Sequence, residues 1–366
     1  MTNRAKATTA ALAAILLAAG NMTAQNTQLM TATKANDYAL AYTLPETALD
    51  ITLEAEITVR KPGEFYRYAR KYLNIDDPIA AESRTATLKS AVVTTRGVRP
   101  ADAVPYAMQL KNGFAAFVML SAEGFPLAIN TEQTAPAETV TLPEPKEAAP
   151  TALETPAARQ VISQEMLQSQ SVAKRAELAA TAIFDLRQSR SELISGQADT
   201  MPPDGKSLQL MLDNLEAQEQ ALLAMFVGTT QTSTVVTTVS VTPDDDISRK
   251  VIARLSPLEG FVSADNLAGD PVYLSVKVTS RGEMPVNDKG ETIPFPKNGV
   301  AYCIPGEAEV TVSYDGRDFY RADREFAQFG IDYGLAPSLL TDRKNPRFMI
   351  FDPATGALLS SGTDQQ

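Results

Sequence analysis

The sequence predicts an α+β protein, with two antiparallel, sandwich-like β-rich domains and a long helical hairpin between them. Apolar and polar residues alternate over residues 49–60 and again over 272–278, which is typical of strands with one buried face. Residues 159–195 contain neither Gly nor Pro, and their apolar residues recur at spacings of three and four, which indicates a helix. Asn112-Gly113 and Asp315-Gly316 are two-residue hairpin signals, one in each β-rich part.

The chain begins like a secretory signal peptide. Residues 1–24 combine basic residues near the start, an apolar run over residues 10–19 and a small-residue exit, with cleavage expected after Gly20 or Ala24. The apolar run is about half of the roughly 20 residues that a membrane-spanning helix needs. No cysteine follows the run to accept a lipid. We therefore expect an exported protein that is neither a lipoprotein nor an integral membrane protein.

The N-terminal β-rich domain is expected to cover residues 38–130 and to carry one short helix. Its strongest strand signal is the alternation in residues 49–60. Weaker strand signals follow at residues 85–96, 105–111, 114–121 and 126–130. Residues 131–157 are mostly Pro, Glu, Ala and Thr, a composition that cannot bury enough apolar area to form a core, so we expect a linker.

A helical hairpin is expected over residues 158–228. Its first helix covers 159–195, and Gly196 ends it. The second helix starts near Lys206 and ends at Gly228, with one apolar seam made by Leu208, Met211, Leu215, Leu222 and Met225. Residues 229–366 then form the C-terminal β-rich domain, in which the Asp315-Gly316 turn sets Val312 opposite Phe319 and residues 347–361 make another hairpin.

The composition excludes several chemistries. The chain has no histidine, which removes Ser-His-Asp and Cys-His hydrolases and His-ligated metal sites together. It has no tryptophan, and Cys303 is its only cysteine, so we expect no intrachain disulfide and a buried, inert thiol. With 44 acidic against 33 basic residues, the net charge of −11 opposes nucleic acid as a partner.

The segment "KPGEFYRYARKYL", residues 61–73, concentrates aromatic and basic side chains. On a helix the rings gather within one arc, while Arg67, Arg70 and Lys71 share the rest. We therefore expect a helix that packs its rings on a sheet and leaves its basic face in solvent. Alternatively, the three basic residues dock onto an acidic neighbour, either a partner or this protein's own surface.

The strongest metal candidate is the run Asp244, Asp245 and Asp246. Three carboxylates with nearby carbonyl groups suit calcium, but adjacent side chains diverge, so an acidic turn is the competing interpretation and no cofactor is expected. Ser171 and Lys174 have the Ser-x-x-Lys spacing, which on an exposed helix is a polar strip rather than a catalytic pair. No catalytic residue is predicted.

Several stretches together resemble one family of exported proteins. They are "YTLPETALDITLEAEI", "KPGEFYRYARKYL", "FPLAINTE" and "QEQALLAMFVGTT", in this order along the chain. The family comes from Gram-negative anaerobes of the Bacteroides type and has only a domain-of-unknown-function label. The resemblance implies a multidomain, β-rich fold in the periplasm or at the cell surface. It implies no activity.

Three functions remain. The first is a non-catalytic envelope protein that acts by contacts with other envelope proteins, and the long hairpin favours it. The second is a carboxylate-dependent hydrolase of an extracellular polymer, which needs two carboxylates facing each other across a cleft. The third is a calcium-binding adhesive module. The lack of clustered reactive residues favours the first.

Overall fold

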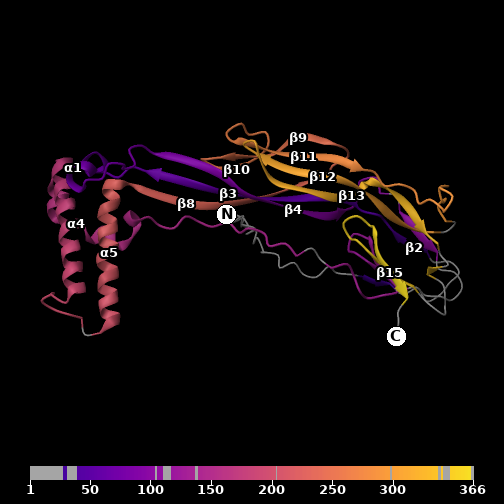
Figure 1. The fold of residues 1–366 in the computed structure, drawn as a ribbon, viewed down its shortest axis with the longest axis horizontal. Coiled ribbons are helices and arrows are strands. Elements are labelled where there is room, and N and C mark those ends of the chain that lie inside the picture. Colours follow the sequence, from indigo (N-terminus) through magenta and orange to yellow (C-terminus); the bar gives the residue numbers. More distant parts are fainter. Residues whose placement is uncertain are drawn as a thin grey trace, which may run out of the picture.

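The computed structural model describes residues 28–30, 39–103, 105–109, 117–136, 139–202, 204–296, 299–336, 339–340 and 347–363. The expected signal peptide and the Asn112-Gly113 turn lie outside these residues. The molecule is elongated: antiparallel sheets form a long body, and two helices stand at one end of it (Figure 1). No helix in the described part of the chain is long and apolar enough to cross a membrane.

The first sheet has three strands in the order β4-β3-β8, all antiparallel: β4 is Ser83–Val98, β3 is Glu46–Lys61 and β8 is Thr229–Val241. The central strand β3 contains the predicted alternation. Leu49, Ile51, Leu53 and Ala55 are buried on one face, as the pattern predicted. The alternation therefore identified both the strand and its buried face.

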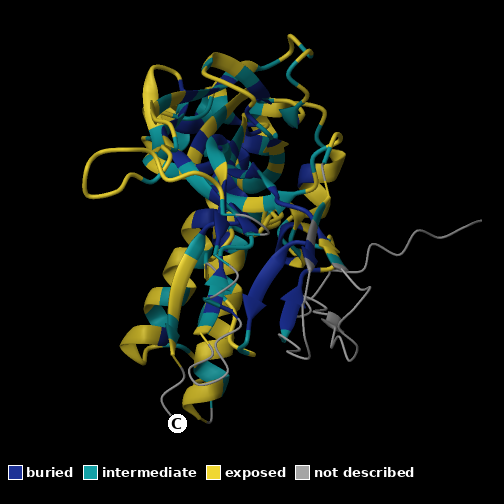
Figure 2. Cartoon of the chain, turned by 90° about the vertical axis from the view of Figure 1, so that its right-hand side faces the viewer, coloured by how far each residue is buried: buried dark blue, intermediate teal, exposed yellow. Residues whose placement is uncertain are grey.

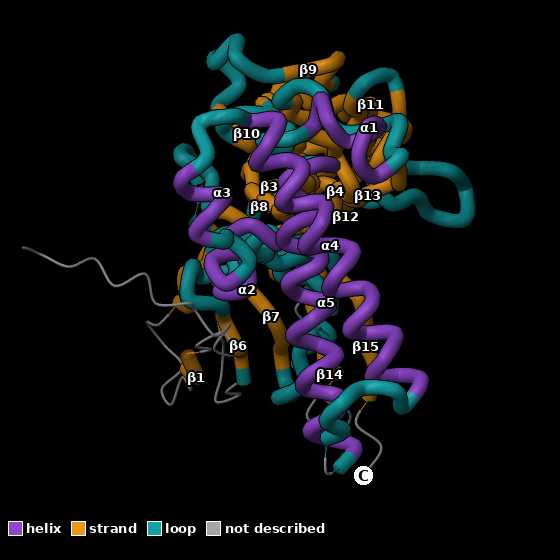
Figure 3. The backbone as a smooth tube through the Cα atoms, turned by 90° about the vertical axis from the view of Figure 1, so that its left-hand side faces the viewer, coloured by secondary structure: helices purple, strands orange, loops and turns teal. Residues whose placement is uncertain are grey.

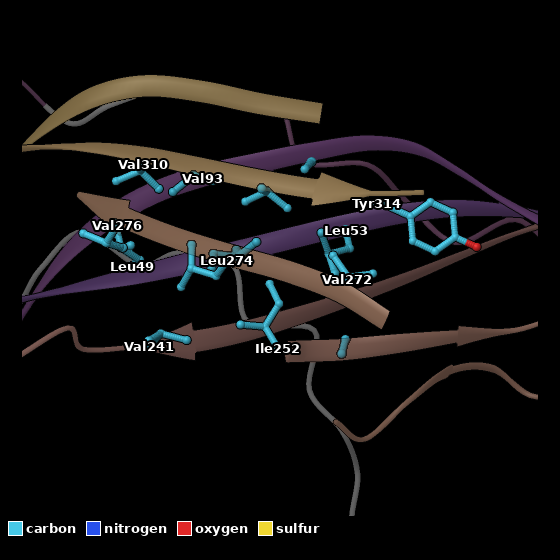
Figure 4. Close-up of a cluster of buried hydrophobic side chains, with 14 of the residues drawn as sticks. Leu49, Leu53, Val93, Val241, Ile252, Val272, Leu274, Val276, Val310 and Tyr314 are labelled. Carbon is cyan, nitrogen blue, oxygen red and sulfur yellow. The ribbon is translucent and has the colours of Figure 1, made fainter. Parts of the chain in front are cut away.

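A second sheet of five strands, ordered β10-β9-β11-β12-β13, covers that buried face. Its strands are β9 (Ile247–Ser256), β10 (Gly260–Val262), β11 (Asp270–Ser280), β12 (Val300–Tyr314) and β13 (Arg317–Leu335). Leu49 and Leu53 from β3 meet Val272 and Leu274 from β11 in one apolar core (Figure 4). The sandwich is therefore made jointly by strands from before and after the helices.

This arrangement corrects the expectation of two separate β-rich domains. Strand β3 pairs along most of its length with β8, from Leu49 opposite Val241 to Lys61 opposite Thr229. Strands of the expected domains 38–130 and 229–366 thus share a sheet and a core. The alternation of a strand shows which face is buried but does not show which strand lies beside it.

A second core lies at the end of the body opposite the helices. It contains a five-stranded sheet in the order β1-β6-β7-β14-β15. These strands are β1 (Gln28–Met30), β6 (Val118–Leu120), β7 (Pro126–Ile129), β14 (Arg347–Phe351) and β15 (Leu358–Thr363). A separate pair is made by β2 (Ala39–Tyr42) and β5 (Tyr106–Gln109). Figure 2 views the molecule from this end and shows buried strands in dark blue. The β14–β15 pair is the terminal hairpin that the sequence predicted.

Strands β12 and β13 join the two cores because each contributes residues to both. Their pairing shifts register between Ile304 and Gly306. At Gly330 on β13, an added Cβ would lie 2.1 Å from the Ile304 carbonyl oxygen, so only glycine allows the strands to approach this closely. The register shift and the glycine together allow β12 and β13 to continue from one core into the other.

The helical end contains more, shorter helices than expected. Its elements are η1 (Tyr66–Tyr68), α1 (Ala69–Leu73), η2 (Ala152–Glu154), α2 (Pro156–Gln160), α3 (Gln164–Gln168), α4 (Val172–Ser195) and α5 (Gly205–Val227). The single helix predicted over 159–195 is wrong, since the chain breaks it into α2, α3 and α4. Ser163 and Ser171 cause the breaks by acting as N-caps: their hydroxyls accept from the Met166 and Lys174 amides. Helices α4 and α5 lie side by side (Figure 3).

The Pro/Glu/Ala/Thr segment runs beside the edge strand β8. Lys146 and Thr234 exchange two backbone hydrogen bonds, of 2.9 and 2.8 Å. The Gln231 side chain donates to the Ala149 carbonyl at 3.3 Å. This part of the expected linker is therefore attached to the sheet and covers some of the exposed edge of β8.

Candidate interaction surface at the helical end

A small apolar core anchors the helical end to the sheet. Phe65, just before η1, is 1 % exposed, and its ring lies 5.4 Å from that of Phe226 on α5. The Phe65 amide donates to the Met225 carbonyl at 2.7 Å. An added Cβ at Gly63 would lie 2.3 Å from the same carbonyl oxygen, so the close approach requires a glycine. The segment 61–73 thus packs on α5 and α4, not on a sheet as expected, and its α-helix begins only at Ala69.

The basic residues of this segment are exposed but have partners within the segment and just after it. The Arg67 side chain donates to the Tyr66 hydroxyl at 2.9 Å, and the Lys71 ammonium lies 4.8 Å from the centre of the Tyr72 ring. Arg70 forms an ion pair of 3.1 Å with Asp76. Both members of that pair are well exposed, which makes it weak. The segregation of rings from bases predicted from the sequence is therefore incomplete.

The three aspartates considered for calcium lie far from the helices, between β8 and β9. Asp245 forms a 3.0 Å ion pair with Arg281, and Asp246 accepts a 2.7 Å hydrogen bond from the Val278 amide. The carboxylates of Asp245 and Asp246 thus attach this turn to the end of β11 and to Arg281, which follows it. Among the described residues, no three His, Cys, Asp or Glu side chains are grouped so that they could hold a metal ion.

Cys303, the lone cysteine, lies on β12 between the two cores. It is 2 % exposed, and its Sγ lies 3.6 Å from the Ala327 carbonyl oxygen. Burial raises the pKa of the thiol to about 12, and Asp332 and Glu325 add to the shift. A thiol with this pKa stays protonated and unreactive at neutral pH. The prediction of a buried, inert thiol is confirmed.

Two carboxyl groups have raised pKa values and bear on the hydrolase alternative. Burial raises the pKa of Glu46, as do Asp102 and Asp244 nearby. Burial, with Asp352 and Glu307, raises the pKa of Glu325. The described surface has two open grooves, one beside Arg84 and Leu258 and one on the outer face of the second sheet. Glu46 and Glu325 line neither of them. These two grooves therefore hold no carboxyl group of raised pKa.

Helices α4 and α5 are held together by different contacts along their length. Near the body, small and apolar residues are buried between them: Ala176, Ala179, Ala180, Ile183, Leu222, Met225 and Phe226. At mid-length a charge bridge replaces this core. Glu219 on α5 is only 5 % exposed, and it receives Arg187 at 2.6 Å and Arg190 at 3.3 Å, both from α4. Because breaking such a bridge leaves a buried charge without a partner, it fixes how the helices pair. No local sequence pattern distinguishes Glu219 from the other acidic residues of α5.

Beyond the charge bridge, large apolar side chains are exposed. The helices extend away from the body in this half (Figure 1), and Leu193 is buried there. Ile194 is 68 % exposed, Leu210 is 71 % exposed, and Met201 and Met211 are 43 and 44 % exposed. The helices seen at the bottom of Figure 2 are largely yellow and teal for this reason. We call Ile194, Met201, Leu210 and Met211 the distal apolar surface.

The helical periodicity predicted this surface only in part. The predicted seam on the second helix included Met211 and Leu215 together with Leu222 and Met225. The last two are buried, while Met211 is exposed and Leu215 is half-buried. A periodic pattern shows that a helix has an apolar face but does not show where its neighbour diverges from that face.

The fold is that of an α+β protein whose body is antiparallel sheet and whose helices are gathered at one end, with an exposed apolar surface on two of them. The chain belongs to the family described as Domain of unknown function (DUF4831), which matches residues 38–359. This range takes in both cores, the helices, every strand from β2 to β14 and the first two residues of β15. No curated protein matches the chain, and no solved structure matches it. The resemblance to an uncharacterised family is thereby confirmed.

Proposed function

We propose that this protein is an exported, non-catalytic protein of the cell envelope, which binds another envelope protein through the distal apolar surface. One observation carries the proposal: two of the most exposed large apolar side chains in the described part of the chain, Ile194 and Leu210, lie in the half of α4 and α5 beyond the charge bridge. Exposing them to water costs about 1.5–3 kcal/mol each relative to burial. A partner that covers them recovers this free energy.

The charged residues around the distal apolar surface indicate which charge a complementary partner would carry. Asp213 and Glu216 on α5 are exposed and follow Leu210 within two turns. Gln209 donates to the Asp213 carboxylate at 2.6 Å, which leaves its negative charge unneutralised. The surface is therefore apolar with an acidic border, and the complementary partner is a protein with an apolar patch and a basic rim.

The first test changes the distal apolar surface itself. Ile194→Glu combined with Leu210→Glu should leave the fold intact, because both side chains are exposed, and should abolish partner capture. The measurement is cross-linking in intact cells followed by mass spectrometry, counting cross-links from residues 158–227 to other proteins.

The matched control is Leu258→Glu combined with Leu267→Glu. These leucines are 72 and 81 % exposed but lie on loops of the second sheet and not on the helices. The control should keep the cross-links of the original protein. Cross-links that persist in the Ile194/Leu210 variant, or that disappear in the control as well, contradict the proposal.

The second test addresses α1. Arg67→Glu, Arg70→Glu and Lys71→Glu together replace the basic face, whose residues have only exposed local partners. If this face docks onto an acidic neighbour, the triple variant loses capture of that partner while its melting temperature changes little. Capture that is unaltered in the triple variant removes α1 from the interaction surface and leaves the distal apolar surface as the binding site.

A further inference from the structure

The outer face of the second sheet carries a polar groove of about 500 Å³. Strands β9, β11, β12 and β13 form its floor. Hydroxyl groups in the groove come from Ser248, Ser275, Thr311 and Ser313, and charged groups from Asp246, Arg249, Lys277, Glu309, Asp318 and Arg321. The groove lies on the side of the sheet opposite the sandwich core, and it includes no residue of the helical end.

The three cations of the groove differ in how their charge is balanced. Arg321 lies 3.0 Å from Asp318 and 4.0 Å from Glu309, so its charge is matched within the protein. Within the described part of the chain, Arg249 and Lys277 have no carboxylate at ion-pair distance, although Glu309 is opposite Lys277 in the ladder. Two cations therefore face the groove without a matched anion.

Hydrogen-bond donors lie between these two cations. Ser275 is two residues before Lys277 on β11 and is opposite Thr311 on β12. The Arg249 amide donates to the Ser275 hydroxyl oxygen at 3.2 Å. Since that oxygen already accepts a bond, the Ser275 proton is available to a group in the groove. Two cations and two hydroxyl donors thus line the same groove.

The backbone at Arg249 is held in an unfavourable conformation at this position. Its φ is 48°, in the left-handed region where a residue other than glycine is uncommon. Its guanidinium lies 4.2 Å from the centre of the Tyr273 ring, and the β9–β11 pairing shifts register twice nearby. Strain and register shifts of this kind gather where a strand aims a side chain at a ligand.

We propose that this groove binds a saccharide that carries one oxyanion, a carboxylate or a sulfate. The oxyanion is held by Arg249 and Lys277 and by the Ser275 and Thr311 hydroxyls, as charge-assisted hydrogen bonds. Asp246, Glu309 and Asp318 accept hydrogen bonds from the sugar hydroxyls at the border of the groove. The same carboxylates and the net charge of −11 repel a ligand with several negative charges. Arg249 covers the Tyr273 ring, so a nucleobase finds no open aromatic face there.

Calorimetric titration of the whole protein tests the proposal with three probes. These are a disaccharide with one glucuronic acid, the methyl ester of the same disaccharide, and a galactose disaccharide with one sulfate. The ester keeps the shape and removes the charge, so it should bind at least tenfold more weakly than the free acid. One charge-assisted hydrogen bond exceeds the free energy of about 1.4 kcal/mol that corresponds to tenfold. The carboxylated and sulfated probes show which oxyanion the groove prefers.

Variants then locate the binding. Lys277→Gln and Arg249→Gly should each weaken the binding of the preferred probe at least tenfold. Glycine tolerates a positive φ, so Arg249→Gly should keep or raise the melting temperature while it loses binding. The control is Lys250→Gln, the same loss of charge on the neighbouring residue of β9, which does not line the groove. It should bind as the original protein does.

Each other outcome overturns the proposal. If none of the probes binds, the groove is not a saccharide site. If inorganic sulfate binds as tightly as the sulfated disaccharide, the groove is a simple anion site. If the ester binds as well as the free acid, or Lys250→Gln weakens binding as much as Lys277→Gln, the two cations do not hold the ligand. The groove and the helices are separate, so failure here leaves the proposed function standing.

Discussion

At the scale of single residues, the exposed face of the first sheet is held by polar bridges between strands. Asp50, on the central strand β3, accepts two hydrogen bonds of 3.0 and 3.4 Å from Arg96 on β4 and one from the Ser240 hydroxyl on β8. Burial alone would raise the pKa of Asp50, but these hydrogen bonds and the Arg96 charge outweigh it and lower the pKa. One carboxylate therefore links all three strands of the sheet.

Asp50→Asn should lower stability in a way that depends on pH. A lowered pKa means that the folded protein favours the ionised carboxylate, so its contribution is present above the ordinary pKa of an aspartate, about 3.9, and is lost as the pH falls through the folded-state value. We expect a loss of about 0.5 kcal/mol at pH 7, because Arg96 is half-exposed and solvent screens the pair. Urea unfolding at pH 7 and at pH 3 measures it. A loss of equal size at both values contradicts this account, and Glu56→Gln, which removes the exposed pair with Lys89, is the control.

Single-residue features were predictable where chemistry depends on one residue type. The buried thiol of Cys303 followed from its apolar neighbours, and the Asp315-Gly316 turn followed from the tolerance of both residues for a positive φ, which they adopt at 48° and 73°. Glu219 and Arg249 were not predictable. Their roles depend on what a different helix or strand places beside them, and nothing local in the sequence carries that information.

At the scale of elements, the strands were predicted better than the helices. Alternation in β3 gave its buried face, whereas the pairing of Val312 with Phe319 was wrong: Val312 lies opposite Tyr320, because the register shifts between Val312 and Ser313. The prediction of one long helix over residues 159–195 was wrong. Ser163 and Ser171 instead compete for backbone amides and restart the helix.

Removing those caps should destabilise the helical end. Ser163→Ala and Ser171→Ala each leave a helix N-terminal amide without its acceptor, and a capping side chain contributes about 1 kcal/mol. Hydrogen exchange at the Met166 and Lys174 amides should become several-fold faster, and the sheet should be unaffected. Ser195→Ala is the matched control, since the Ser195 hydroxyl only donates to the Glu192 carbonyl at the other end of α4. Faster exchange in the control but not in the cap variants would contradict the capping role.

At the scale of the whole molecule, the two β-rich parts of the chain are not independent. Strand β3 has β8 as a neighbour, and its buried face lies on strands that follow the helices. The hydrophobic pattern could not predict this, because pairing between distant strands depends on geometry that periodicity does not record. The helices are therefore inserted between two neighbouring strands of one sheet. Lys61 and Thr229 lie opposite each other where the chain leaves this sheet and returns to it.

Fragments 38–157 and 229–366 should therefore fail to fold when produced separately. The first alone would expose Leu49, Ile51 and Leu53, and the second would expose Val272 and Leu274. We expect collapsed NMR dispersion and rapid proteolysis for each fragment, with ordered signals only in their mixture or in the whole chain. A chain in which a short Gly/Ser linker replaces residues 191–215 should remain folded, because the core at the base of the helices is retained. Well-dispersed spectra from either isolated fragment would restore the two-domain arrangement.

The position of Lys61 opposite Thr229 also bears on the order in which the molecule assembles. Pairing of β3 with β8 closes a very long loop, and such closures slow folding. Contacts within 61–73 and between α4 and α5 are nearer in sequence, and the Phe65–Phe226 contact brings both strand ends together at the same place. Once the helical end has formed, the sheet can pair residue by residue from Lys61–Thr229 toward Leu49–Val241, because the long loop is already closed.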